Sequence, residues 1–141
     1  MANGRNCGDL LKQIHDELEK QANNLLRAQD LTMAQVGALL ALNQTSEKQM
    51  SLKDLERWLH VAQSTAAGIA SRLEQKGFVE AFGDPTDKRI KMLRITSSGM
   101  SCCKTAEKNM IATEQKLLSG LTEEEQAIFK MFLLKVRNSL K

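Results

Sequence analysis

The sequence predicts a mostly α-helical (α+β) fold, on the basis of its composition and its hydrophobic periodicity. The chain has 141 residues, of which 42% are hydrophobic and 26% are charged, as in a compact globular domain. One proline, four phenylalanines, one tryptophan and no tyrosine leave little of the turn-rich, aromatic composition of β-sandwiches and barrels. Apolar residues recur at spacings of three and four along much of the chain, which is the period of amphipathic helices.

Two amphipathic helices are expected first. Residues 8–28 place apolar side chains at helical spacing with charged side chains between them, which predicts a long helix. Thr32 and Gln35 have the spacing of a capping box, and Leu31 and Val36 that of a hydrophobic staple, so a second helix should begin directly after Thr32. We expect its inward face to consist of Met33, Val36, Leu39 and Leu40.

Two closely connected helices follow residues 43–49, which are polar and aperiodic and therefore predict a loop. Ser51, with Asp54 three residues later, predicts the start of a short helix. A further helix is expected from Ala62 to Lys76, because Gly77 stands where helices prefer a C-terminal glycine. Its apolar side is formed by Ala66, Ile69, Ala70 and Leu73, and its other side is small or polar.

A β-hairpin and two helices complete the predicted order. Residues 78–82 and 90–95 favour strands, and the polar segment between them holds the only proline, Pro85, which predicts a two-stranded hairpin with a long tip. Thr96 opens a helix to about Leu118, and a capping box opens the last helix at Thr122. The last helix has a wide apolar face of Ile128, Phe129, Phe132, Leu133, Val136 and Leu140.

Residues 51–95 thus have the order of a winged helix-turn-helix, in which the second helix enters the DNA major groove and the hairpin lies along the adjacent backbone or minor groove. A helix in a groove needs short side chains, so that its backbone approaches the bases, and hydrogen-bonding groups that read base edges. We expect the recognition helix to contact double-stranded DNA through Gln63, Ser64, Thr65, Ala67, Gly68, Ser71 and Arg72.

The hairpin concentrates positive charge, although the net charge of the whole chain is only +3. The basic residues Lys88, Arg89, Lys91 and Arg94 lie close together at its tip and on its returning strand. We expect a DNA-binding wing made of Asp87, Lys88, Arg89 and Lys91, in which Arg89 suits a narrow minor groove.

These motifs resemble the MarR (multiple antibiotic resistance regulator) family of bacterial transcription factors, over nearly the whole chain. The resemblance implies that Asp87 shapes the wing through an ion pair while Arg89 addresses the minor groove. Gly68 departs from the family pattern, since many relatives have a basic, base-reading side chain there. The resembling segments are Leu31-Thr32-Met33-Ala34-Gln35, Ser64-Thr65, Arg72-Leu73-Glu74-Gln75-Lys76-Gly77-Phe78-Val79, Asp84-Pro85-Thr86-Asp87-Lys88-Arg89, Leu93-Arg94-Ile95-Thr96 and Gly99.

The resemblance also implies a single domain over residues 1–141, with a DNA-binding lobe at 31–96 and a helical dimerisation region at 8–28 and 97–141. A homodimer would explain the surplus of apolar surface on the terminal helices. The implied function is repression at a palindromic operator, relieved by a small-molecule effector of aromatic or phenolic character.

Two alternatives stay open. One is a thiol-based redox regulator that senses through Cys7, at the start of the first helix. Cys102 and Cys103 are adjacent in a predicted helix, so their side chains point about 100° apart and a disulfide between them would be strained. They are instead expected to be small buried side chains. The other alternative is a winged-helix protein-interaction module that does not bind DNA.

Other functional classes lack the residues that they require. We find no nucleophile with an adjacent base, no phosphate-binding loop and no metal-ligand spacing, so we expect no enzyme activity, cofactor or metal. No stretch reaches the roughly 18 apolar residues of a membrane span, so a cytoplasmic protein without membrane association is expected. Trp58, Phe78 and Phe82 are expected to pack in the core or on the hairpin.

Overall fold

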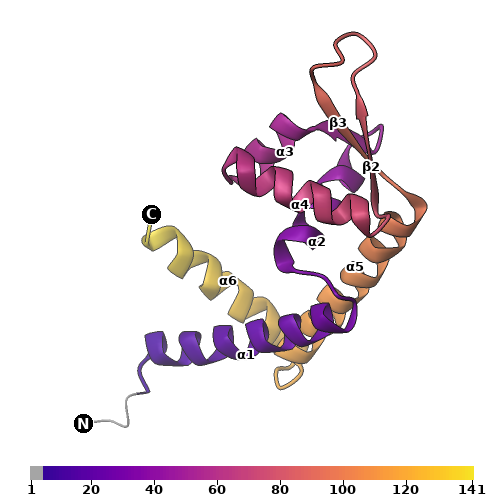
Figure 1. Ribbon diagram of the computed structural model, residues 1–141. Helices are drawn as coiled ribbons and strands as arrows, with labels where there is room; N and C mark the ends of the chain where they lie inside the picture. The colour runs from indigo at the N-terminus through magenta and orange to yellow at the C-terminus, as the bar shows by residue number, and fades with distance from the viewer. Residues whose placement is uncertain (1–4) are drawn as a thin grey trace. The chain divides into compact units, whose positions relative to one another are not determined.

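The computed structural model describes residues 5–141, which form six helices and one three-stranded antiparallel sheet (Figure 1). The chain forms two compact units, Met1–Glu107 and Lys108–Lys141, and the fifth helix runs from the first into the second. Among the described residues, no helix is both long and apolar enough to cross a membrane. The elements in chain order are α1 (Cys7–Ala28), α2 (Met33–Gln44), β1 (Gln49–Ser51), α3 (Leu52–Leu59), α4 (Gln63–Gln75), β2 (Val79–Gly83), β3 (Lys91–Ile95), α5 (Ser97–Leu118) and α6 (Glu123–Ser139).

The predicted helix starts are confirmed, because their side-chain caps form. In the first capping box, the Gln35 backbone N–H donates to Thr32 Oγ1 at 3.2 Å, and the Thr32 N–H donates to Gln35 Oε1 at 3.2 Å. Thr122 and Glu125 make the same pair of bonds at 3.2 and 2.9 Å. Ser51 Oγ accepts the Asp54 N–H at 3.0 Å.

The segment 43–49, for which the sequence predicts a loop, is a loop only between the end of α2 and the start of β1. α2 continues to Gln44, and β1 then pairs antiparallel with β3, so that Met50 lies opposite Leu93. Because β2 pairs with the other edge of β3, the hairpin becomes a sheet of order β1-β3-β2. A strand of three residues is too short to show alternation in the sequence, and it forms because the β3 edge offers hydrogen-bond partners.

The core of the first unit lies where α2, α3 and α4 pack together and against β3 and α5. Two sequence expectations for this core are wrong. Met33 is exposed, because the buried side of α2 runs through Gln35, Leu39 and Leu42, and Met33 lies about 200° around the helix from Gln35. Trp58 is also exposed, whereas Phe78 packs against the core as expected. The largest fully buried side chains are Leu39, Leu42, Leu55, Leu73, Leu93 and Cys103.

The end of α4 is joined tightly to the sheet and to the start of α5. Gly77 has φ = +77°, and the N–H groups of Gly77 and Phe78 donate to the carbonyls of Glu74 and Leu73, both at 3.0 Å. This pattern is a Schellman motif, and it needs a left-handed residue that glycine provides without strain. A Cβ at Gly99 would lie 2.6 Å from Ile95 Cγ1 and would collide with the carbonyl oxygen of Phe78, so α5 passes the sheet at backbone contact.

The second unit and α1 each carry apolar side chains that nothing in their own unit covers. In the second unit, Gln126 Nε2 caps the turn between α5 and α6 by donating to the carbonyls of Leu118 and Leu121 at 3.1 and 3.2 Å. The α6 side chains left exposed are Ile128, Met131, Phe132, Leu133, Leu134 and Val136. Leu140, directly after α6, is also exposed, and α5 adds Met110 and Ile111. On α1, the exposed apolar residues are Leu10, Leu11, Ile14 and Leu25.

We expect Gly99→Ala to lower the free energy of unfolding by about 1–3 kcal/mol, because the new methyl group overlaps the Phe78 carbonyl and Ile95. Gly68→Ala is the matched control, since a Cβ there meets nothing within 4 Å and the site is interior to α4. This control should raise the stability by about 0.5–1 kcal/mol. Urea unfolding followed by circular dichroism measures both changes, and equal effects of the two variants would contradict the close packing at Gly99.

Candidate nucleic-acid interface

The helix α4 presents a polar face to solvent. Its buried side consists of Ala66, Ile69, Ala70 and Leu73, as the sequence pattern predicted. The expected contact residues lie on the other side, where Gln63, Ser64, Thr65, Gly68, Ser71 and Arg72 are exposed and Ala67 is half-buried. These small side chains let the α4 backbone approach a partner closely, while the hydroxyl and amide groups remain able to hydrogen-bond.

The turn before α4 is formed without glycine. His60 has φ = +55°, its N–H donates to the Arg57 carbonyl at 3.3 Å, and the Val61 N–H donates to the Glu56 carbonyl at 3.2 Å. This motif ends α3 and turns the chain directly into α4, which packs against α3. The two helices therefore form the helix-turn-helix that the sequence predicted.

The first turn of α4 keeps its backbone N–H groups free of a side-chain cap, because the N-cap residue is Ala62. The other five helices in residues 5–141 all begin with a capping side chain, from Asn6, Thr32, Ser51, Thr96 and Thr122. Uncapped N–H groups at a helix N-terminus attract anions, since the helix dipole adds to their partial charge. The start of α4 is therefore suited to a phosphate.

The loop between β2 and β3 is shaped by two carboxylates and projects from the sheet (Figure 1). Asp84 Oδ1 accepts from the Thr86 N–H at 2.8 Å and from Thr86 Oγ1 at 2.7 Å. Asp87 Oδ1 accepts from the Arg89 N–H at 3.1 Å, and the backbone closes where the Asp84 N–H donates to the Ile90 carbonyl at 3.0 Å. These bonds give a long loop a defined conformation.

Asp87 also forms an ion pair with the Arg89 side chain. Arg89 Nε donates to Asp87 Oδ1 at 3.1 Å, and Arg89 Nη2 donates to Asp87 Oδ2 at 3.2 Å. The Arg89 side chain is 90% exposed and that of Asp87 34% exposed, so the carboxylate holds one edge of a guanidinium that otherwise faces solvent. Arg89, first through its side chain and then through its backbone N–H, lowers the pKa of Asp87, while hydrogen bonds from Thr86 lower the pKa of Asp84.

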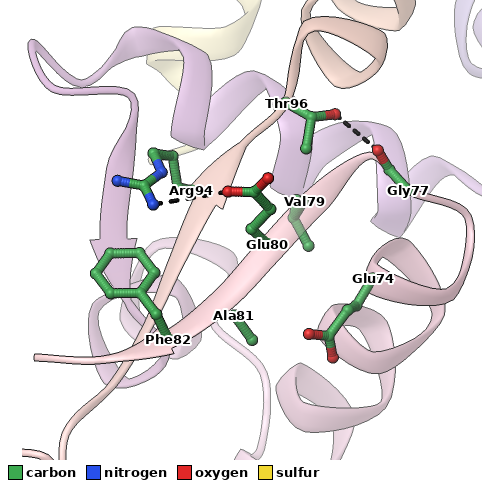
Figure 2. Close-up of a pocket in the computed structure, with 8 residues that line it drawn as sticks. All are labelled: Glu74, Gly77, Val79, Glu80, Ala81, Phe82, Arg94 and Thr96. Carbon is green, nitrogen blue, oxygen red and sulfur yellow. Dashed lines mark hydrogen bonds and ion pairs between the residues drawn. The ribbon is translucent and has the colours of Figure 1, made fainter.

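Arg94 does not belong to the basic loop, although the sequence groups it with Lys88, Arg89 and Lys91. Its guanidinium lies on the outer face of the sheet, with Nη2 3.6 Å from Glu80 Oε2 and Cζ 4.6 Å from the centre of the Phe82 ring (Figure 2). These contacts occur in an open groove of about 490 Å³ that also includes Glu74. Glu80 offsets the charge of Arg94 as Asp87 offsets that of Arg89, so the positive charge of the loop comes from Lys88, Lys91 and the solvent-facing edge of the Arg89 guanidinium.

The three cysteines differ in exposure. Cys7 is exposed at the start of α1, Cys102 is half-buried and Cys103 is buried, so the prediction of small buried side chains in α5 is confirmed for Cys103 and only partly met by Cys102. Burial raises the pKa of the Cys102 thiol, and it raises that of Cys103 to about 11. Within residues 5–141, no three His, Cys, Asp or Glu side chains are arranged to hold a metal ion.

These features are shared with a known family of proteins. A model of the MarR family matches residues 31–91 of the chain, which include α2, the helix-turn-helix and the β2–β3 loop. The transcriptional activatory protein BadR of Rhodopseudomonas palustris is 28% identical over 133 residues, which cover 93% of this chain and 76% of BadR.

Solved structures show the same arrangement. A mutant of S. aureus MepR has a TM-score of 0.89 at 26% identity, over 97% of this chain and 100% of that one. A mutant MarR from E. coli complexed with operator DNA has a TM-score of 0.70 at 26% identity, over 92% of this chain and 91% of that one. The predicted fold class, a mostly helical winged helix-turn-helix, is confirmed.

We expect Asp84 and Asp87 to titrate below the ordinary carboxylate pKa of about 3.9, and we expect salt to change the pKa of Asp87 only. The ion pair between Asp87 and Arg89 is fully present above the ordinary carboxylate pKa, and it is lost as the pH falls through the lowered pKa of Asp87. Salt at about 1 M, where the Debye length is roughly 3 Å, should raise the pKa of Asp87 but leave that of Asp84 lowered, because neutral Thr86 donors hold Asp84.

Carboxyl-detected NMR titration measures both groups. Arg89→Gln should raise the pKa of Asp87 alone, and Thr86→Val that of Asp84 more than that of Asp87. If the pKa of Asp87 changes neither with salt nor in Arg89→Gln, the ion pair does not form in solution.

Proposed function

Because this chain belongs to the MarR family of winged-helix transcriptional regulators, we propose that it is a homodimeric repressor that binds a palindromic DNA operator. The observation that carries the proposal is an exposed polar face on α4 in the same unit as a basic loop that Asp84 and Asp87 hold in shape. The similar mutant MarR from E. coli is complexed with operator DNA, which supports the same partner for this chain. The protein is thus a transcription factor and not an enzyme.

The proposed DNA contacts follow from chemistry and exposure. Gln63, Ser64 and Thr65 start α4, where uncapped N–H groups meet phosphate and the side chains reach base edges. Ala67 and Gly68 let the backbone approach the major groove, and Ser71 and Arg72 continue this face towards the DNA backbone. In the wing, Asp87 orients Arg89 for the minor groove, and Lys88 and Lys91 add phosphate contacts.

The proposed dimer covers the exposed apolar surface of the terminal helices. α6 alone leaves six large apolar side chains in water, which is more than a monomeric domain ordinarily exposes on one helix. We assign residues 31–96 to the DNA-binding lobe, and 8–28 and 97–141 to dimerisation. A two-fold axis then requires a palindromic operator with half-sites about one helical turn, roughly 10 bp, apart.

Regulation is proposed to use a small aromatic or phenolic effector in the cytoplasm, where bacterial operators lie. An effector releases DNA only if it binds more tightly to a dimer whose two α4 helices are wrongly spaced, since it shifts the population towards that state.

The thiol-based alternative still depends on Cys7 alone, because the raised pKa values of Cys102 and Cys103 make them poor nucleophiles at neutral pH.

Selection of bound fragments from random DNA should yield a palindrome, and binding to it tests the assigned residues. We expect Arg89→Ala to weaken binding about tenfold or more, because the minor-groove contact is lost, and Arg72→Ala to reduce the salt slope by about one. Arg94→Gln is the matched control, since Arg94 is engaged by Glu80 and Phe82 and should leave both quantities unchanged. Fluorescence anisotropy measures them, and wild-type affinity in both Ala variants would refute the site.

We expect Phe132→Glu to convert the dimer into monomers and to abolish operator binding, because a carboxylate would be buried in the proposed interface. Lys130→Glu is the control, since residues 130 and 132 lie about 200° apart on α6 and only the second is on the apolar face. Sedimentation equilibrium measures the mass of each variant. A dimeric Phe132→Glu protein would exclude this face of α6 from the interface.

A further inference from the structure

One side chain, Lys76, ties the end of the recognition helix α4 to the connection between α1 and α2. Its Nζ donates to the backbone carbonyl of Asp30, lies 3.3 Å from Gln35 Oε1 and lies 3.7 Å from Asp30 Oδ2. The Lys76 side chain is only 27% exposed, so its stem packs against the protein while the ammonium reaches these acceptors. Because the partners are 46 and 41 residues away in sequence, the contact joins separate elements and not neighbouring turns.

The carbonyl that Lys76 contacts belongs to a sharply turned helix end. Asp30 has φ = +56°, its N–H donates to the Arg27 carbonyl at 3.1 Å, and the Leu31 N–H donates to the Leu26 carbonyl at 3.0 Å. α1 thus ends in a Schellman motif with aspartate in the left-handed position, which costs more than glycine would. α4 ends in the same motif at Gly77, so Lys76 bridges two helix ends that both have fixed turns.

The hydrogen bonds of Gln35 show that the start of α2 does not require the contact with Lys76. Its side chain is buried, with 4% exposed, and its Oε1 already accepts the Thr32 N–H in the capping box. Removal of the ammonium leaves that box in place, so α2 keeps its start. What is lost is the polar link between α4 and residues 29–32, which set the direction in which α1 leaves the lobe.

We propose that Lys76 is a positioning residue for operator recognition, which holds α1 at a fixed angle to α4 and thereby sets the half-site spacing that the dimer accepts. The inference rests on the proposed function, in which α1 belongs to the dimerisation region and α4 reads DNA. Two recognition helices must lie about one DNA turn apart to bind together, so a small change in the α1–α4 angle alters which spacing fits. Core contacts hold α4 to α2, α3 and β2, and Lys76 extends this to the α1–α2 connection.

The test uses the full-length protein and the selected operator, together with operators whose central spacer is one base pair longer or shorter. Lys76→Met keeps the apolar stem and removes the ammonium. We expect the preference for the native spacing over the altered ones to fall by about three- to tenfold, which is the loss of one or two polar contacts. The salt slope should not change, because Lys76 is proposed to contact the protein and not phosphate.

Three controls separate positioning from a general structural role. Lys76→Arg keeps the positive charge and N–H donors in a larger planar group, and should keep most of the spacing preference. Asp30→Asn removes only a carboxylate that is 98% exposed and keeps both the Asp30 carbonyl and the tolerance for a positive φ, so it should behave as wild type. The urea midpoint of Lys76→Met should lie close to that of the wild type, since no buried group loses its last partner.

The outcomes are distinct. An unchanged spacing preference in Lys76→Met overturns the inference, and so does a salt slope that falls by about one, which would make Lys76 a phosphate contact. Wild-type protein that selects no palindrome refutes the proposed function itself. Faster amide hydrogen exchange at residues 29–32 in DNA-free Lys76→Met supports the link to α1 independently of DNA, and unchanged exchange there overturns it.

Discussion

The arrangement of the first unit of the chain depends on the close contact of three backbone segments at the end of α4. The Thr96 hydroxyl donates to the Gly77 carbonyl at 2.7 Å and accepts the Gly99 N–H at 3.1 Å, while the Thr96 N–H donates to the Phe78 carbonyl at 3.0 Å. Gly77 supplies the left-handed turn and Gly99 the missing side chain that this approach requires. One threonine therefore holds the end of α4, the start of β2 and the start of α5 together.

Charge is distributed within this frame according to what each side chain contacts. The net charge of +3 says little about DNA binding, because Arg94 is paired with Glu80 over the Phe82 ring on the sheet, whereas Lys88, Lys91 and the Asp87-paired Arg89 lie exposed on the loop and the strand after it. The two acids of the wing reduce its net charge but give it a shape, since each accepts backbone N–H bonds. A preformed wing loses less conformational entropy when it binds, which offsets the charge that the carboxylates remove.

The two proposed activities, dimerisation and DNA recognition, use different surfaces of a small chain. The apolar faces of α1 and α6 are wide and uncovered, whereas the face of α4 is narrow and polar. In such a regulator the position of the α4 face must depend on the dimer interface. The reason is that the spacing of two DNA half-sites is a property of the dimer and not of one subunit. Within the first unit, Lys76 at the end of α4 contacts the Asp30 turn that ends α1.

The sequence by itself determined the helix starts, the two faces of α4, the position of the wing and the resemblance to the MarR family, because these depend on neighbouring residues. Thr32 with Gln35, and Thr122 with Glu125, form their caps wherever the helix lies. Only the tertiary structure decided the features that depend on distant partners. The strand β1 exists because β3 offers an edge, Met33 and Trp58 are exposed because other side chains fill the core, and Arg94 leaves the basic cluster because Glu80 lies beside it. Lys76 gave no local signal, since its acceptors are more than forty residues away and only folding brings them together.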